Sequence, residues 1–226
     1  MAEIVSGHIT GFDQYGYTIR TDQPPDAFQL THRQYEEVRI ELIDGRHITP
    51  EQRRKAWAIM TDIAVWQGST KDEVYRDMKM IFREKYVDTL QQTLFRMSQM
   101  DVTTAREFIN LLVDTVLEYD IPLRQPLAEN TDDITHYIYQ CLRTRKCAVC
   151  GKAAELHHVE RVGMGRNRDD ICHIGMDCLP LCRNHHDEAH HIGDALLMDK
   201  YHLESVKINT EIAQIYKLGR KTHDQD

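Results

Sequence analysis

Cysteine and histidine residues with the spacing of metal ligands are concentrated between residues 147 and 190. A structural zinc site needs four thiolate or imidazole ligands in a closed tetrahedron, and two ligands separated by two residues can aim at one ion from a short turn. Such pairs occur twice, as Cys147-x-x-Cys150 and as Cys182-x-x-His185. We therefore predict one structural zinc ion, Zn²⁺, held by Cys147, Cys150, Cys182 and His185.

Four further histidines, His157, His158, His186 and His190, remain for a second site. His186 and His190 are four residues apart and would share one face of a helix, whereas His185 would lie about 100° away. Hydrolysis of a phosphodiester needs a deprotonated water and a cation on the phosphoryl oxygens. A neutral imidazole can accept the proton of that water, and a metal on three histidines keeps positions open for substrate. The set supplies one base and three ligands.

From about residue 141 to residue 195 the chain resembles the HNH nuclease family in its zinc-finger-bearing form, in which a ββα unit holds a catalytic divalent metal. The resemblance implies that His157 is a metal ligand, that His158 is the general base, and that His186 and His190 are ligands from the helix. The implied catalytic metal is Mg²⁺, Mn²⁺, Ni²⁺ or Zn²⁺. At the position of the family's Asn this chain has Asp177, which we assign to the catalytic set with His158. An ionised Asp accepts hydrogen bonds but cannot donate one.

Other interpretations of the cysteines were weighed. A disulfide framework is disfavoured because the N-terminus has no secretory pattern and the spacing suits metal. A zinc deaminase would need its Cys-x-x-Cys after the His-x-Glu element, and here it comes before. A purely structural zinc in a DNA-binding module remains an alternative.

The remaining cysteines and histidines carry weaker expectations. We expect Cys141 to be a packed apolar residue, and Cys172 and Cys178 lack a partner at metal-ligand spacing. His191 should face solvent. His173 is expected to be a loop histidine, although it could take over some function of the missing Asn.

The net charge of −8 does not by itself favour nucleic acid binding. All of the excess acid lies in residues 1–140, however, and residues 141–226 are balanced. A basic cluster surrounds the proposed site, where bound metal would add positive charge, so a phosphate-binding surface is plausible. The predicted DNA-binding residues are Arg143, Arg145, Lys146, Arg161, Arg166 and Arg168.

The pattern of residues along the chain predicts an α+β fold. Strands are expected over 4–12, 15–21 and 37–43. Helices are expected to open at Thr49, Thr70 and Thr104, each followed three residues later by Glu or Gln as in a capping box. A helix over 132–145, a strand over 206–208 and a helix over 209–218 complete the prediction. No apolar run is long enough for a membrane span, so a cytoplasmic protein is expected.

The strings at residues 51–63 and 102–108 resemble the phage Orf (NinB-type) recombination mediators. That resemblance implies binding to single-stranded DNA and to the host single-strand-binding protein, assembly as a homodimer, and a phage protein acting in the bacterial cytoplasm. It also implies two domains, an Orf-like strands-then-helices domain over 1–130 and a zinc-bound ββα-metal (HNH) domain over 131–226.

These observations together predict a phage recombination protein with metal-dependent DNA endonuclease activity on single-stranded, branched or duplex DNA. The alternative is a non-catalytic mediator whose zinc module only binds DNA. A third hypothesis, which the acidic N-terminal half would suit, is a protein-binding adaptor.

Overall fold

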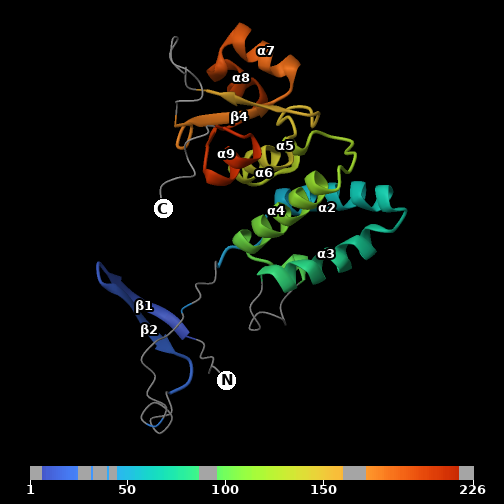
Figure 1. The fold of residues 1–226 in the computed structure, drawn as a ribbon. Helices are drawn as coiled ribbons and strands as arrows, with labels where there is room; N and C mark the ends of the chain where they lie inside the picture. The colour runs from blue at the N-terminus through green and yellow to red at the C-terminus, as the bar shows by residue number, and fades with distance from the viewer. Residues whose placement is uncertain are drawn as a thin grey trace.

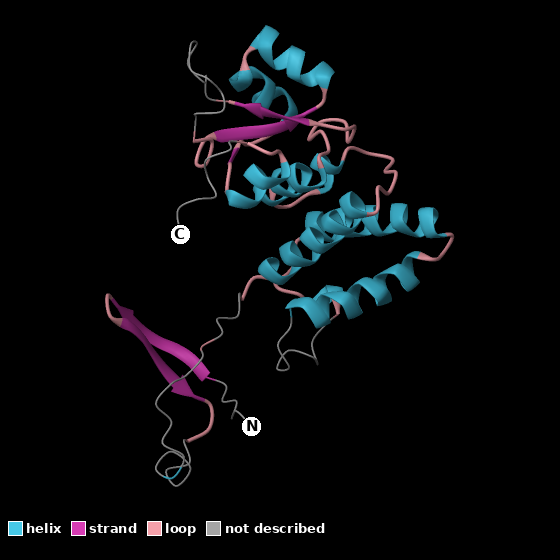
Figure 2. Cartoon of the chain, viewed as in Figure 1, coloured by secondary structure: helices cyan, strands magenta, loops and turns pink. Residues whose placement is uncertain are grey.

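The computed structural model describes residues 7–24, 32, 40, 45–86, 96–159 and 172–218. A β-hairpin comes first, long helices follow, and a small sheet with helices packed on it completes the chain (Figure 1). The described strands are confined to the hairpin and this sheet (Figure 2). The chain is therefore a mixed α+β structure, as predicted. None of the described helices is long and apolar enough to cross a membrane.

The N-terminal hairpin consists of β1 (Gly7–Asp13) and β2 (Gly16–Thr21), which pair antiparallel. The Asp13 carboxylate accepts the backbone N–H of Gly16 at 3.1 Å and so closes the turn. These strands confirm the first two predicted ones. The strand predicted over 37–43 lies outside the described residues except for Ile40.

Two predicted capping boxes open the first long helices. Thr49 Oγ1 accepts the N–H of Gln52 and the Gln52 side chain accepts the N–H of Thr49, both at 3.1 Å, at the start of α2 (Pro50–Gln67). Thr70 and Glu73 make the equivalent bonds at the start of α3 (Lys71–Tyr86). Each bond satisfies a backbone group that the first helical turn leaves open.

The third long helix starts three residues earlier than predicted. It is α4 (Val102–Glu118), and its N-cap is Asp101, not Thr104. The Asp101 carboxylate accepts both the N–H and the hydroxyl of Thr104, at 2.8 and 2.6 Å. An N-cap Asp therefore places Thr104 inside the first turn, where its capping-box spacing to Glu107 has no role.

The three long helices bury apolar stripes against one another. Ile59 and Ile63 of α2 and Phe108 and Leu112 of α4 are almost fully inaccessible to solvent. Phe82 of α3 completes the contact, with its ring centroid 5.6 Å from that of Phe108. One contiguous set of buried residues extends from here into the C-terminal sheet. The predicted division of the chain at residue 130 stays a prediction.

The C-terminal part is built on an antiparallel sheet in the order β3 (Glu155–His158), β4 (Asp177–Leu181), β5 (Val206–Lys207). Helices α7 (Arg183–Ile192) and α8 (Asp194–Tyr201) lie on one side of it, and α6 (Ile134–Thr144) and α9 (Thr210–Ile215) lie on the other (Figure 1). The sheet thus holds α7 beside β4. The remaining short helices are η1 (Met97–Gln99) and α5 (Leu127–Asn130).

Candidate metal centre

The four predicted zinc ligands lie together, at the junction of the turn after α6 and the start of α7. Cys147 Sγ and Cys182 Sγ lie 3.4 and 3.3 Å from Nδ1 of His185, and Cys150 Sγ lies 3.6 Å from Cys182 Sγ. Metal–ligand bonds of 2.0–2.3 Å in a tetrahedron put neighbouring ligand atoms about 3.4–3.8 Å apart. The observed distances are close to these edges, so the four atoms fit around one zinc ion.

Local backbone geometry brings the first pair of cysteines into position. The N–H of Gly151 donates to the carbonyl of Cys147 at 2.8 Å, and Gly151 has φ 69°, a conformation that a residue with a Cβ rarely adopts. The resulting tight turn places Cys147 and Cys150 on the same side. Cys182 is the N-cap of α7, and His185 lies in its first turn.

The thiols differ in their ease of ionisation. Burial raises the pKa of Cys147 to about 12. Burial acts in the same direction on Cys182, but hydrogen bonds from the backbone N–H of His185 and from neighbouring thiols outweigh it and lower its pKa. Cys182 therefore loses its proton more readily than Cys147, and a bound cation would favour the thiolate form of both.

A second group of possible ligands consists of His157 on β3 and His186 and His190 on α7. Each residue offers one ligand atom, and these atoms all lie within 4.8 Å of one another. The ring centroid of His186 is 4.7 Å from that of His157 and 4.6 Å from that of His190. As predicted, the i, i+4 spacing puts both helix histidines on one face, while His185 turns to the zinc cluster.

The donor set of this second group suits a divalent cation. Nδ1 of His186 is buried and has no hydrogen-bond partner among the described residues, which a buried polar atom rarely tolerates. Burial, followed by the electrostatic influence of His157 and His190, lowers the pKa of His186. The shift favours the neutral ring, which is the form that binds a metal.

A carboxylate that the sequence did not bring to attention completes the group. Asp194 Oδ1, at the start of α8, lies 2.7 Å from Nε2 of His157. This distance is shorter than the edge of about 3.3 Å or more expected for two ligands of one tetrahedral zinc, and it suits an N–H donor and a carboxylate acceptor. The contact leaves the other nitrogen of His157 for a metal.

The two predicted catalytic residues have separate surroundings. Nε2 of His158, the last residue of β3, lies 2.9 Å from Nδ1 of His173. The Asp177 carboxylate instead accepts from Lys207 Nζ at 3.0 Å and from Ser205 Oγ at 3.4 Å. The backbone carbonyl of Asp177 accepts the N–H of Val159 at 2.9 Å and so fixes the chain directly after His158.

The other cysteines behave as expected. Cys141 and Cys178 are buried, and burial raises the pKa of each thiol to about 12. Cys172 is exposed and belongs to neither group of possible ligands. The thiols of Cys141 and Cys178 therefore stay protonated at neutral pH and serve as packed apolar groups.

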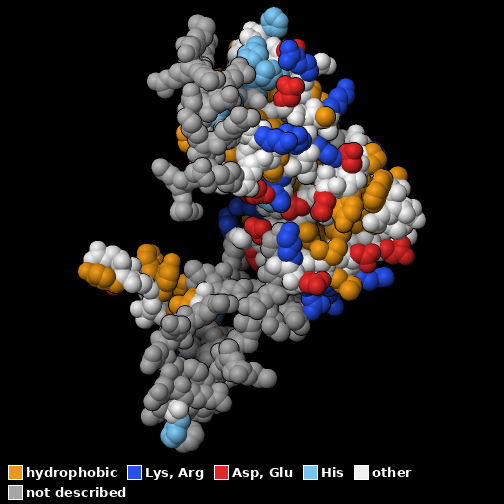
Figure 3. Space-filling model, viewed as in Figure 1, with side chains coloured by type: hydrophobic (Ala, Val, Ile, Leu, Met, Phe, Trp, Pro, Cys, Tyr) orange, Lys and Arg blue, Asp and Glu red, His pale blue; other side chains and the backbone are white. Residues whose placement is uncertain are grey.

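Three of the six predicted DNA-binding residues are described, and all three have partners within the protein. Arg143 donates to Glu211 at 2.7 Å, Lys146 is paired with Asp120, and the Arg145 guanidinium lies 4.8 Å from the ring centroid of Tyr216. Figure 3 shows histidine side chains gathered at the end of the molecule where α7 lies, with Lys and Arg nearby. The DNA-binding assignment stays a prediction, and its other members, Arg161, Arg166 and Arg168, lie outside the described residues.

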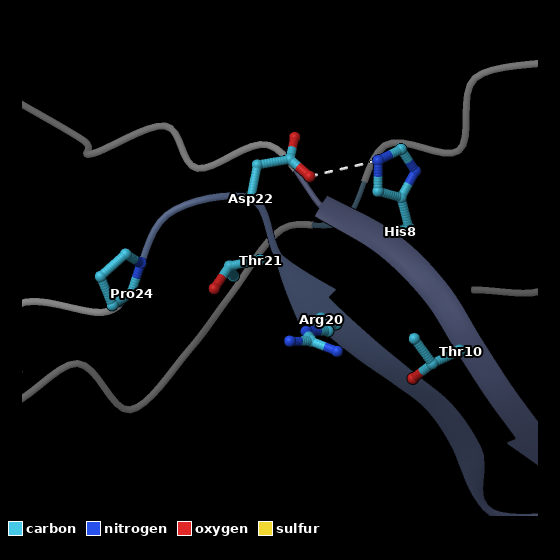
Figure 4. Close-up of a pocket in the computed structure, with 6 residues that line it drawn as sticks. All are labelled: His8, Thr10, Arg20, Thr21, Asp22 and Pro24. Atoms are coloured by element: carbon cyan, nitrogen blue, oxygen red, sulfur yellow. Dashed lines mark ion pairs between the residues drawn. The ribbon is translucent and has the colours of Figure 1, made fainter.

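A pocket beside the N-terminal hairpin is a different kind of site. Figure 4 shows an ion pair across it, with His8 Nε2 3.2 Å from Asp22 Oδ1. Both side chains are well exposed, and neither belongs to a group of three possible metal ligands among the described residues. The lining residues of the pocket are His8, Thr10, Arg20, Thr21, Asp22 and Pro24.

The family described as "Putative HNHc nuclease" matches residues 22–219 of this chain. The match covers far more than half of the 226 residues, so the chain belongs to this family of HNH nucleases. The resemblance predicted for residues 141–195 is thereby confirmed at the level of the family. A comparison with curated proteins and a comparison with solved structures each gave no match. The Orf-type resemblance stays a prediction.

Proposed function

We propose that this protein is a metal-dependent DNA endonuclease that hydrolyses phosphodiester bonds at the histidine group on β3 and α7. The observation that carries the proposal is the convergence of His157, His186 and His190, separate from a zinc-type cluster and including the residue directly before His158 in the chain. A binding module would need the cysteine cluster alone. The second group, with its orphaned His186 nitrogen, supports catalysis.

The proposed roles follow from the geometry. A divalent metal held by His157, His186 and His190 would polarise the phosphoryl oxygens and stabilise the departing oxygen. His158 accepts the proton of the attacking water. His157 and His158 are adjacent at the end of β3, and their shared action on one phosphate is what the family resemblance implies. In-line attack with a 3′-oxygen leaving group gives 5′-phosphate and 3′-hydroxyl ends.

Supporting residues hold this arrangement. Asp194 accepts the N–H of His157 and thereby selects the nitrogen that faces the metal. Asp177 ties β4 to β5 through Lys207, so it can perform by accepting hydrogen bonds the tethering that the family's Asn would perform. The structural zinc on Cys147, Cys150, Cys182 and His185 holds the first turn of α7.

One experiment tests the proposal directly. Purified protein is incubated with supercoiled plasmid and with branched DNA in Mg²⁺, Mn²⁺, Ni²⁺ or Zn²⁺, and nicking is followed on gels. His158→Ala should lose about 10²–10⁴ of the rate. His191→Ala, which removes an exposed histidine from the same helix, should cut like wild type. Nicking by His158→Ala at the wild-type rate would assign the base elsewhere or reveal a contaminant.

A second proposed function concerns the N-terminal half. We infer from the Orf-type strings, which lie on α2 and at the start of α4, that the chain acts in phage recombination, binding single-stranded DNA and the host single-strand-binding protein as a homodimer. The two helices pack together, so the strings form part of one body. The alternative is that the protein is a non-catalytic recombination mediator. Its zinc module would then bind DNA without cutting it.

The two functions are separable on the full chain. His158→Ala should bind single-stranded DNA or the single-strand-binding protein as tightly as wild type, and light scattering should give the mass of a dimer. A monomer that binds neither partner at low salt, where phosphate contacts are strongest, would refute the mediator role. It would leave the nuclease proposal intact.

A further inference from the structure

We propose that His173 is a positioning residue that fixes the orientation of the His158 ring. This role rests on the nuclease function proposed above and adds a residue to it. The observation behind it is the distance of 2.9 Å between Nδ1 of His173 and Nε2 of His158. The ring centroids are 4.9 Å apart and the ring planes are tilted by 47°.

The contact restricts the ring of His158. A bond between Nε2 of His158 and Nδ1 of His173 needs a hydrogen on one nitrogen and a lone pair on the other, so it defines how the two rings face each other. The ring of His158 is therefore held by a side-chain contact, in addition to the backbone bond that fixes the chain directly after it.

The fold holds His173 firmly enough for this role. Its side chain is buried, with 7% of its surface exposed. Its carbonyl accepts the N–H of Met176 at 3.2 Å, in a turn where Gly175 has φ 86°. The N–H of Gly175 donates to Ile208 at 2.8 Å, and the N–H of Ile208 donates to Met176 at 2.9 Å. The turn is thus pinned to the chain just after β5.

Asp177, the residue at the position of the family's Asn, has its carboxylate committed elsewhere. Its two oxygens accept from Lys207 and Ser205, and neither is directed at His158 in any described hydrogen bond. Asp177 therefore links β4 to β5, whereas His173 contacts the ring of His158.

The test compares two substitutions that separate packing from hydrogen bonding. His173→Leu fills the space without a hydrogen-bonding group, and His173→Asn restores such a group near the position of Nδ1. Single-turnover cleavage of DNA is measured at saturating metal for both, with His158→Ala and His158→Ala/His173→Leu beside them. Calorimetry gives the metal affinity, and circular dichroism checks the fold.

We expect His173→Leu to lower kcat about 10- to 100-fold with KM and metal affinity unchanged, and His173→Asn to recover most of the rate. The double variant should be no slower than His158→Ala, because the contact acts through the base.

Three results would overturn the proposal: wild-type rates in His173→Leu, equal loss in the Leu and Asn variants, or further slowing of His158→Ala by the second substitution. Each leaves the nuclease function standing. Absence of cleavage by the wild-type protein in every metal would instead reject that function.

Discussion

The Asp194 carboxylate, at the first position of α8, meets the ring of His157 on β3 at 2.7 Å. The contact joins a helix to a strand that is distant in sequence, across the histidine group. A histidine that binds metal through one nitrogen commonly donates its other N–H to such a carboxylate. The relationship places Asp194 beside the candidate metal site as a hydrogen-bond partner of one proposed ligand.

Asp194→Asn should weaken binding of the catalytic metal about 10- to 100-fold, because the amide is a poorer acceptor for the N–H of His157. Titration against a chelating dye measures the affinity. Asp187→Asn, at an exposed position on α7, is the matched control and should bind like wild type. Equal affinity in both variants would mean that the Asp194 contact does not support the metal.

Substitution of a helix histidine should act through metal affinity. His186→Ala should lose most of its activity at low metal, and excess metal should restore part of it, because two ligands remain. His191→Ala should need no more metal than wild type. The measurement is cleavage rate against metal concentration. Lost activity in His186→Ala with an unchanged metal requirement would remove His186 from the ligand set.

Alkylation of the cysteines should report the zinc cluster. In the zinc-loaded protein Cys150 should resist iodoacetamide, and after chelation it should react, whereas the exposed Cys172 should react in both states. Cys141 and Cys178 should stay unreactive in the folded protein. Their pKa of about 12 lies three units above an ordinary thiol, which lowers the reactive thiolate about a thousandfold. Peptide mass mapping identifies each site.

Zinc removal should also loosen the C-terminal part of the chain. Cys147→Ser should lower the zinc content and increase proteolysis within residues 141–195, since metal binding supplies folding free energy to small modules. Cys172→Ser is the control. A metal-free protein with undiminished protease resistance in this segment would contradict the structural role.

The sequence was sufficient to predict which side chains gather in the two candidate metal groups, because their spacing is local. The x-x pairs need only a turn, and the i, i+4 histidines need only a helix. His173 and Asp194 were not assigned, since each acts through a residue on another element and neither belongs to a spaced pair. Only the pairing of β3 with β4 and the packing of α8 reveal these contacts.

The helix starts also show that a local sequence pattern does not reveal contacts with other parts of the chain. Thr49 and Thr70 cap the helices that they were predicted to cap, whereas α4 is capped by Asp101. Both Asp101 and Thr104 are good capping residues, so the local pattern leaves the choice open. An additional contact decides it, because the backbone of Asp101 pairs with His47 in a β-bridge.

Adjacent side chains of α7 serve different clusters, and this limits how the gene can change. His185 faces the cysteines, while His186 faces His157 and His190. One inserted or deleted residue between Cys182 and His186 would rotate everything after it by about 100° and shift it by about 1.5 Å. Evolution can therefore exchange residues along this stretch, but a change in its length would separate the two clusters at a single step.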